Sequence, residues 1–150
     1  MSVIPKFVAQ MEKKIASNKI LVSIYANYYS EVVRNEIKLA NITREDRVIN
    51  IGCGGIPFTA LLIARFTGAR VWAIDNDENA VDVARSCVSA QSLENLITVL
   101  HLDGRDRIPL NFDVALVALQ AEPKKDILNN LRLHGDNNAR HIFRKPRQGL

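Results

Sequence analysis

The sequence RVINIGCGGIPFTALLIARFTGARVWAID, residues 47–75, decides the fold of this chain. In order it holds a short apolar run, a glycine cluster, an apolar segment of helical length, a second apolar run and an acid. Continuous apolar runs of this kind are typical of strands buried on both faces of a parallel sheet. Gly52, Gly54 and Gly55 allow a tight turn and let a ligand approach the backbone closely. Asp75 comes 21 residues after Gly54, where an α/β nucleotide-binding domain holds ribose hydroxyls.

A tight turn with no ligand is the alternative explanation of these glycines. The complete order of strand, glycines, helix, strand and acid favours a nucleotide site over that alternative. A dinucleotide fingerprint needs a third glycine three residues after Gly54, and the chain has Pro57 there, which disfavours NAD. Pro57 instead suits the first turn of a helix that we expect to end at Gly68.

Further apolar runs predict three more strands, at residues 96–102, 112–119 and 139–143. We therefore expect an α/β, Rossmann-like fold with a mostly parallel five-stranded sheet in the order 3-2-1-4-5 and helices on both faces. Residues 1–40 predict an N-terminal helical cap, and residues 41–150 predict the Rossmann-like domain, together forming one compact unit.

The predicted cap carries a row of large apolar side chains. Leu21, Tyr25, Tyr28 and Val32 recur at the spacing of one helical face. This pattern indicates core packing, and the alternative is that tyrosines line an acceptor pocket and donate a hydrogen bond there.

The composition is that of an ordinary globular protein, with 47% hydrophobic and 24% charged residues. No apolar run reaches the roughly 20 residues of a membrane span, so we expect no membrane partner. Cys53 and Cys87 lack metal-ligand spacing and fit free thiols in the cytoplasm, with no metal bound. The net charge is +4, and the sequence from Arg132 onward contains five Arg or Lys residues but only one acid, Asp136. A solvated tail explains them better than nucleic-acid contact, which stays the alternative.

The chain resembles two known families. The segment from Asn50 to Gly54, followed by Asp75, resembles the first two motifs of class I S-adenosylmethionine-dependent methyltransferases, over roughly residues 41–144. Asn50 stands where that family has an acid, and its amide can still accept a hydrogen bond. IGCGGIPFTALLIA and ARHIFRKPRQGL are similar, more loosely, to nicotianamine synthases, which transfer the methionine-derived aminocarboxypropyl chain of the same cofactor.

The resemblance implies an S-adenosylmethionine site at the carboxyl edge of the sheet, with Asp103 binding the adenine amino group. The implied cofactor residues are Asn50, Gly52, Cys53, Gly54, Gly55, Asp75, Asn76, Asp103, Gly104 and Gln120. The catalytic residues stay open, and the candidates are Tyr25, Tyr28, Gln120 and Glu122. A turn acid at Asp103 and a helix-start acid at Glu122 are the structural alternatives.

The resemblance implies an S-adenosylmethionine-dependent transferase, foremost a methyltransferase with a small-molecule acceptor. The alternatives are an aminocarboxypropyl transferase, a non-catalytic adenosylmethionine-binding protein and a nicotinamide-dependent oxidoreductase. Methyltransferases of this class continue with two more strands, so we expect a short acceptor half. The uncovered edge of strand 139–143 also predicts a homodimer.

Overall fold

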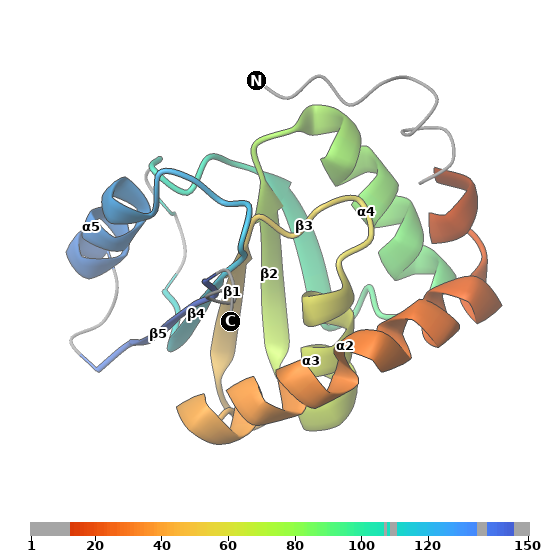
Figure 1. Ribbon diagram of the computed structural model, residues 1–150, viewed down its shortest axis with the longest axis horizontal. Helices are drawn as coiled ribbons and strands as arrows, with labels where there is room; N and C mark the ends of the chain where they lie inside the picture. The colour runs from red at the N-terminus through yellow and green to blue at the C-terminus, as the bar shows by residue number, and fades with distance from the viewer. Residues whose placement is uncertain (1–12, 107, 109–110, 135–137, 146–150) are drawn as a thin grey trace, which may run out of the picture.

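In the computed structural model, five parallel strands form one sheet in the order β3-β2-β1-β4-β5 (Figure 1). The structure describes residues 13–106, 108, 111–134 and 138–145. The strands are β1 (Arg47–Ile51), β2 (Arg70–Asp75), β3 (Ile97–His101), β4 (Val114–Val117) and β5 (Arg140–Phe143). The helices are α2 (Lys19–Ala40), α3 (Phe58–Thr67), α4 (Glu78–Ala90) and α5 (Lys124–His134). The predicted Rossmann-like fold and strand order are confirmed.

The helices divide between the two faces of the sheet, α2, α3 and α4 on one side and α5 on the other (Figure 1). The first face is packed mainly by small and branched residues, whereas Phe112, Ile127 and Leu131 cover the second face. Between β3 and β4, none of the described residues (102–106, 108 and 111–113) lies in a helix. Among the described residues, α5 and a few side chains of this segment, Ile108 and Phe112 among them, cover the second face.

The fourth strand is shorter than its apolar run. Residues 112–119 were expected to be extended, but only Val114–Val117 pair in the sheet. Phe112 is fully buried although it precedes the strand, because it belongs to the core cluster on the α5 face, with Ile127 and Leu131. A buried side chain beside the sheet therefore lengthened the apolar run in the sequence just as a residue of the strand would.

The apolar row predicted to pack in the core lies on the outside of α2. Tyr28 is 80% exposed, and Leu21, Tyr25 and Val32 are also exposed. The buried face consists of Val22, Ala26, Val33, Glu36 and Ala40. Small residues let α2 approach α3 closely, so the smaller side chains point inward and the core-packing prediction is wrong. None of the helices within the described residues has the length and apolar character that a membrane span requires.

Two arginines connect β5 to α2. Arg140 donates to the Ala40 carbonyl and to the Asp46 carboxylate, each at 2.5 Å. Arg144 pairs with the buried Glu36. Both belong to the segment predicted to be a solvated basic tail, and the structure instead uses them to attach the edge of the sheet to the helical layer.

Replacing Phe112 by alanine should lower the free energy of unfolding by about 3–5 kcal/mol, because a fully buried aromatic ring leaves a cavity. Leu133→Ala is the matched control, since Leu133 on α5 is 80% exposed and should change stability little. Urea unfolding measures both. A loss below about 1 kcal/mol for Phe112→Ala would contradict the packing described for the α5 face.

Candidate functional site

A cavity of about 310 Å³ lies at the carboxyl edge of the sheet, beside the ends of β1 and β4. Five parts of the chain contribute to it: β1, the glycine turn with the start of α3, the segment after β4, the residue after β5, and one tyrosine of α2. The lining residues are Tyr29, Asn50, Gly52, Cys53, Gly54, Gly55, Ile56, Phe58, Thr59, Ala118, Gln120 and Arg144. Ligands of open parallel sheets bind at such a carboxyl edge.

The glycine turn is fixed to β2 by hydrogen bonds. The N–H groups of Gly52 and Cys53 both donate to the Ile74 carbonyl, at 2.9 and 3.0 Å. The Gly54 N–H donates to Asp75 Oδ2 at 2.9 Å. Gly52 has φ +78°, and a Cβ there would lie 3.0 Å from the Ala121 side chain. Glycine is therefore required at Gly52 by both backbone conformation and space.

Asp75 holds the turn rather than projecting freely. Its second carboxylate oxygen, Oδ1, accepts from the Asp77 N–H at 2.9 Å, at the start of α4. A carboxylate has about four lone-pair sites, so both oxygens keep acceptor capacity for a ligand. Asp75 thus joins the glycine turn to α4, but it is not among the residues that line the cavity, and its role at the ribose stays a prediction.

Asn50 lines the cavity and has an unsatisfied side-chain acceptor that is itself buried. The residue is only 3% exposed, and its Nδ2 donates to the Leu116 carbonyl at 3.3 Å. Its Oδ1 has no hydrogen-bond partner among the described residues. A buried acceptor without a partner costs free energy, so a ligand N–H or O–H at this point would remove that cost.

The other predicted cofactor residues lie in two places. Gln120 lines the cavity and donates from Nε2 to the Gly52 carbonyl at 3.1 Å. Cys53, Gly54 and Gly55 also line it, whereas Asn76, Asp103 and Gly104 follow β2 and β3 and lie outside it. The sheet order places them at the same carboxyl edge, because β2 stands between β1 and β3.

Asp103 is already paired in this structure. Arg105 donates from Nε and Nη2 to the two carboxylate oxygens, at 3.1 and 2.9 Å. These hydrogen bonds hold the pKa of Asp103 below its usual value, so the carboxylate stays ionised. Gly104 has a packing role of its own, since a Cβ there would lie 2.8 Å from Ile51 Cγ2.

The catalytic candidates on α2 and after β4 mostly lie away from the cavity. Tyr25 and Tyr28 are exposed and line no part of it. Glu122 is exposed and pairs with Lys124 at 3.0 Å, in keeping with a helix-start acid. Of the four candidates only Gln120 lines the cavity, and their catalytic roles stay predictions.

The predicted tyrosine-lined pocket includes one of the three tyrosines considered, Tyr29, and five further lining residues were not predicted: Ile56, Phe58, Thr59, Ala118 and Arg144. Tyr29 stacks on Phe58 with ring centroids 4.9 Å apart, and both line the cavity. Arg144 also lines it and joins Glu36 to Thr59. The adjacent tyrosines were a usable signal for Tyr29, but no sequence pattern relates Glu36 to an arginine 108 residues away.

Cys53 lines the cavity without being a nucleophile at neutral pH. Burial, and then the charge of Asp75, raise the pKa of its thiol far above the ordinary value. Since the thiolate is the reactive form, the side chain acts as a small apolar surface. Burial also raises the pKa of Cys87, in the core, to about 11.

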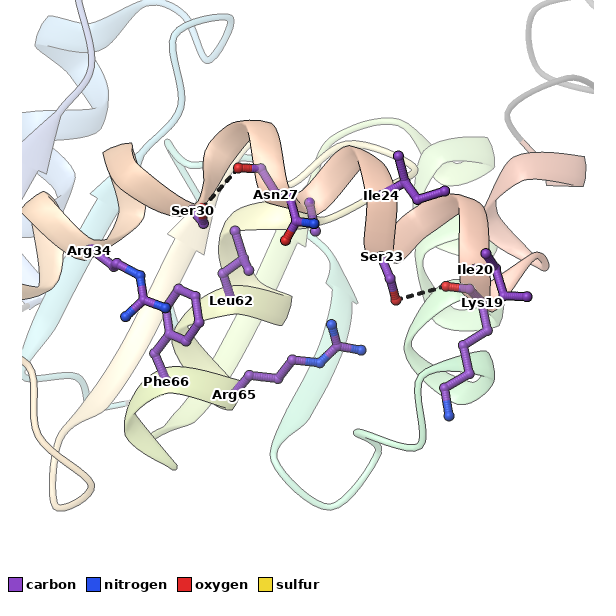
Figure 2. A pocket seen from close by; sticks show the side chains of 11 residues that line it. Lys19, Ile20, Ser23, Ile24, Asn27, Ser30, Arg34, Leu62, Arg65 and Phe66 are labelled. Atoms are coloured by element: carbon purple, nitrogen blue, oxygen red, sulfur yellow. Dashed lines mark hydrogen bonds between the residues drawn. The ribbon is translucent and has the colours of Figure 1, made fainter.

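A larger cavity of about 470 Å³ lies between α2 and α3 (Figure 2). The Arg34 guanidinium lies over the Phe66 ring, 4.0 Å from the ring centroid. Lys19 and Arg65 also line this cavity. Neither of the unsatisfied buried side-chain atoms found among the described residues, on Asn50 and His141, belongs to this wall. The smaller cavity therefore carries the stronger evidence of a ligand site.

Asn50→Leu should leave the free energy of unfolding of the ligand-free protein unchanged or raise it by up to about 1 kcal/mol, because it removes an unsatisfied buried acceptor. Asn130→Leu is the matched comparison. Asn130 is similarly buried, but its Nδ2 donates to the Gly104 and Asp106 carbonyls, so we expect a loss of about 1–3 kcal/mol. Urea unfolding measures both variants. Equal losses in the free energy of unfolding would contradict the conclusion that Asn50 has an unsatisfied acceptor.

Comparison with known proteins gives partial matches to transferases. No family model matches the chain. An L-histidine 2-aminobutanoyltransferase of Pseudomonas aeruginosa is 37% identical over 70 residues, which are 47% of this chain and 27% of that protein. The chain thus spans about a quarter of the length of that curated relative.

The structural likeness covers more of the chain. The nicotianamine synthase MtNAS, solved as a mutant in complex with S-adenosylmethionine, matches with a TM-score of 0.79 and 26% identity over 91% of this chain and 55% of its own. An RNA methyltransferase from Salinibacter ruber matches with a TM-score of 0.62 at 20% identity, over 79% of each chain, and shows the fold alone. The chain has the Rossmann-like fold shared by S-adenosylmethionine-dependent methyltransferases and nicotianamine synthase, as the sequence predicted.

Proposed function

We propose that this chain binds S-adenosylmethionine and transfers a group from it to a small-molecule acceptor. The observation that carries the proposal is the cavity at the glycine turn, which is lined by Asn50, a residue whose buried Oδ1 has no partner among the described residues. An acceptor in that position suits the amino group of the cofactor's methionine end. The solved structure of MtNAS with S-adenosylmethionine supports the choice of ligand.

The chain's own residues fit the cofactor in three parts. Asp75, at the end of β2, would accept from the ribose hydroxyls, while the glycine turn beside it leaves room for the ligand. Asp103, at the end of β3, would accept from the adenine amino group, and its ionised state suits that role. Asn50 would hold the amino-acid end, beyond the glycines. The three positions follow the order β3, β2, β1 across the sheet.

The cofactor supplies an activated sulfonium, so the protein's task is mainly to align an acceptor with the reacting carbon. Attack on the methyl carbon breaks one C–S bond and leaves S-adenosylhomocysteine. Attack on the methionine-derived chain breaks another C–S bond and leaves methylthioadenosine. In both cases the bonding electron pair passes to sulfur, and the acceptor loses a proton.

Methyl transfer was the first prediction, but the relatives favour transfer of the methionine-derived chain. The 2-aminobutanoyltransferase and nicotianamine synthase matches both exceed 25% identity, whereas the methyltransferase matches do not. We therefore place aminocarboxypropyl transfer ahead of methyl transfer. Such names suggest an amino-acid acceptor, with histidine as the first compound to test.

Two further parts of the proposal concern the setting. Cys53 and Cys87 are free and buried, in keeping with the cytoplasmic location proposed from the sequence. A homodimer that covers β5 also stays a proposal. Its support is the position of β5 at the edge of the sheet, although α2 already packs against that strand.

The reaction class can be tested by product analysis. Purified protein incubated with S-adenosylmethionine and a panel of amino acids, histidine first, should form methylthioadenosine and an acceptor heavier by the aminocarboxypropyl group. Liquid chromatography with mass spectrometry identifies both products. Accumulation of S-adenosylhomocysteine would establish methyl transfer instead, and cofactor binding without any product would contradict the enzymatic proposal.

Asp75→Ala should weaken binding of S-adenosylhomocysteine by about 1.5–3 kcal/mol, because a charged acceptor for the ribose is lost. Asp77→Ala is the control, since Asp77 caps α4 and its loss should cost about 1 kcal/mol of stability without changing affinity. Isothermal titration calorimetry on variants shown to be folded by circular dichroism measures the difference. If Asp75→Ala binds S-adenosylhomocysteine as tightly as wild type, Asp75 does not contact the ligand.

A further inference from the structure

Arg144 reaches the cavity beside the glycine turn from the edge of the sheet. It follows β5, and its N–H donates to the Val117 carbonyl at 3.1 Å, which continues the pairing of β5 with β4. Successive side chains of a strand point to opposite faces, so Arg144 shares a face with Ile142, which packs on the layer of α2 and α3. The guanidinium thereby enters the space between the helices and the carboxyl edge.

One edge of that guanidinium is held by protein groups. Nε and Nη2 donate to the two carboxylate oxygens of Glu36, at 2.9 and 2.5 Å, and Nη2 also donates to Thr59 Oγ1 at 2.9 Å. Glu36 is only 7% exposed, so the pair has a fixed geometry. Nη1 has no partner in the described part of the chain, and Arg144 lines the cavity.

The charges around the cavity suit a zwitterion. Arg144 and Glu36 neutralise each other, and Asn50, in the same wall, carries no charge. An α-amino-acid group brings one ammonium and one carboxylate, so it adds no net charge to this wall. The ammonium matches the free acceptor of Asn50, and the carboxylate matches the free donors of Arg144.

We propose that Arg144 binds the carboxylate of a ligand's amino-acid group through Nη1, while Glu36 and Thr59 hold its guanidinium in position. This inference rests on the proposed function. The carboxylate has two sources, the methionine end of the cofactor and an amino-acid acceptor. Arg144 is then a binding and specificity residue for ligands that carry this group.

The test compares ligands with and without the carboxylate. S-adenosylhomocysteine carries the amino-acid end, and methylthioadenosine lacks it. Calorimetry with both ligands is done on wild type, on Arg144→Lys, and on the double variant Glu36→Gln with Arg144→Gln, which leaves no buried charge unpaired. L-histidine titrated into protein saturated with methylthioadenosine tests the acceptor as the source.

If the cofactor supplies the carboxylate, both variants should bind S-adenosylhomocysteine roughly 10- to 100-fold more weakly and methylthioadenosine within about twofold of wild type. If the acceptor supplies it, both adenosine ligands should bind as in wild type, and histidine should lose affinity by a similar factor. Arg140→Lys is the control, because Arg140 joins the same strand to α2 but does not line the cavity.

Two results overturn the inference alone. One is that neither carboxylate ligand loses affinity relative to methylthioadenosine in the Arg144 variants. The other is that Arg140→Lys causes the same selective loss, which would make the effect one of strand attachment. Wild-type protein that binds neither adenosine ligand would overturn the proposed function and this inference with it.

Discussion

The hydrogen bond from the Gly54 N–H to the Asp75 carboxylate joins the two central features of this structure. It connects the turn after β1 to the end of β2, while the Ile74 carbonyl accepts from Gly52 and Cys53 just before it. The turn can take this course only because Gly52 and Gly54 adopt positive φ. Backbone conformation, strand pairing and one charged side chain thus fix the same few atoms, and the cavity is built on them.

The rest of the site shows how polar groups are placed at a buried edge. Arg144 donates both to Glu36 and to Thr59 Oγ1, so this charge pair is largely satisfied before any ligand arrives. Asn50 is the exception, with one acceptor left over. Buried polar groups are normally satisfied, so unsatisfied ones in a cavity wall indicate where a ligand contributes the missing partner.

The sequence predicted the parts of the structure that depend on local pattern. The apolar runs and the glycines identified β1, β2 and their connection, and Gly68 ends α3 in the left-handed conformation as expected. Tertiary packing decided the rest. The prediction of the inward face of α2 was wrong because the helix buries Val22, Ala26 and Val33 and leaves the tyrosines outside. The Glu36–Arg144 pair depends on the fold alone.

The attachment of β5 to α2 also has a consequence for the order of assembly. The ion pair between Glu36 and Arg144, of which Arg144 lines the cavity, joins residues 108 positions apart in the chain. Contacts of such separation carry a large loop-closure entropy and form only after much of the intervening chain is ordered. During folding the glycine turn can therefore form well before the cavity is complete, and ligand binding would report the moment at which β5 joins the sheet.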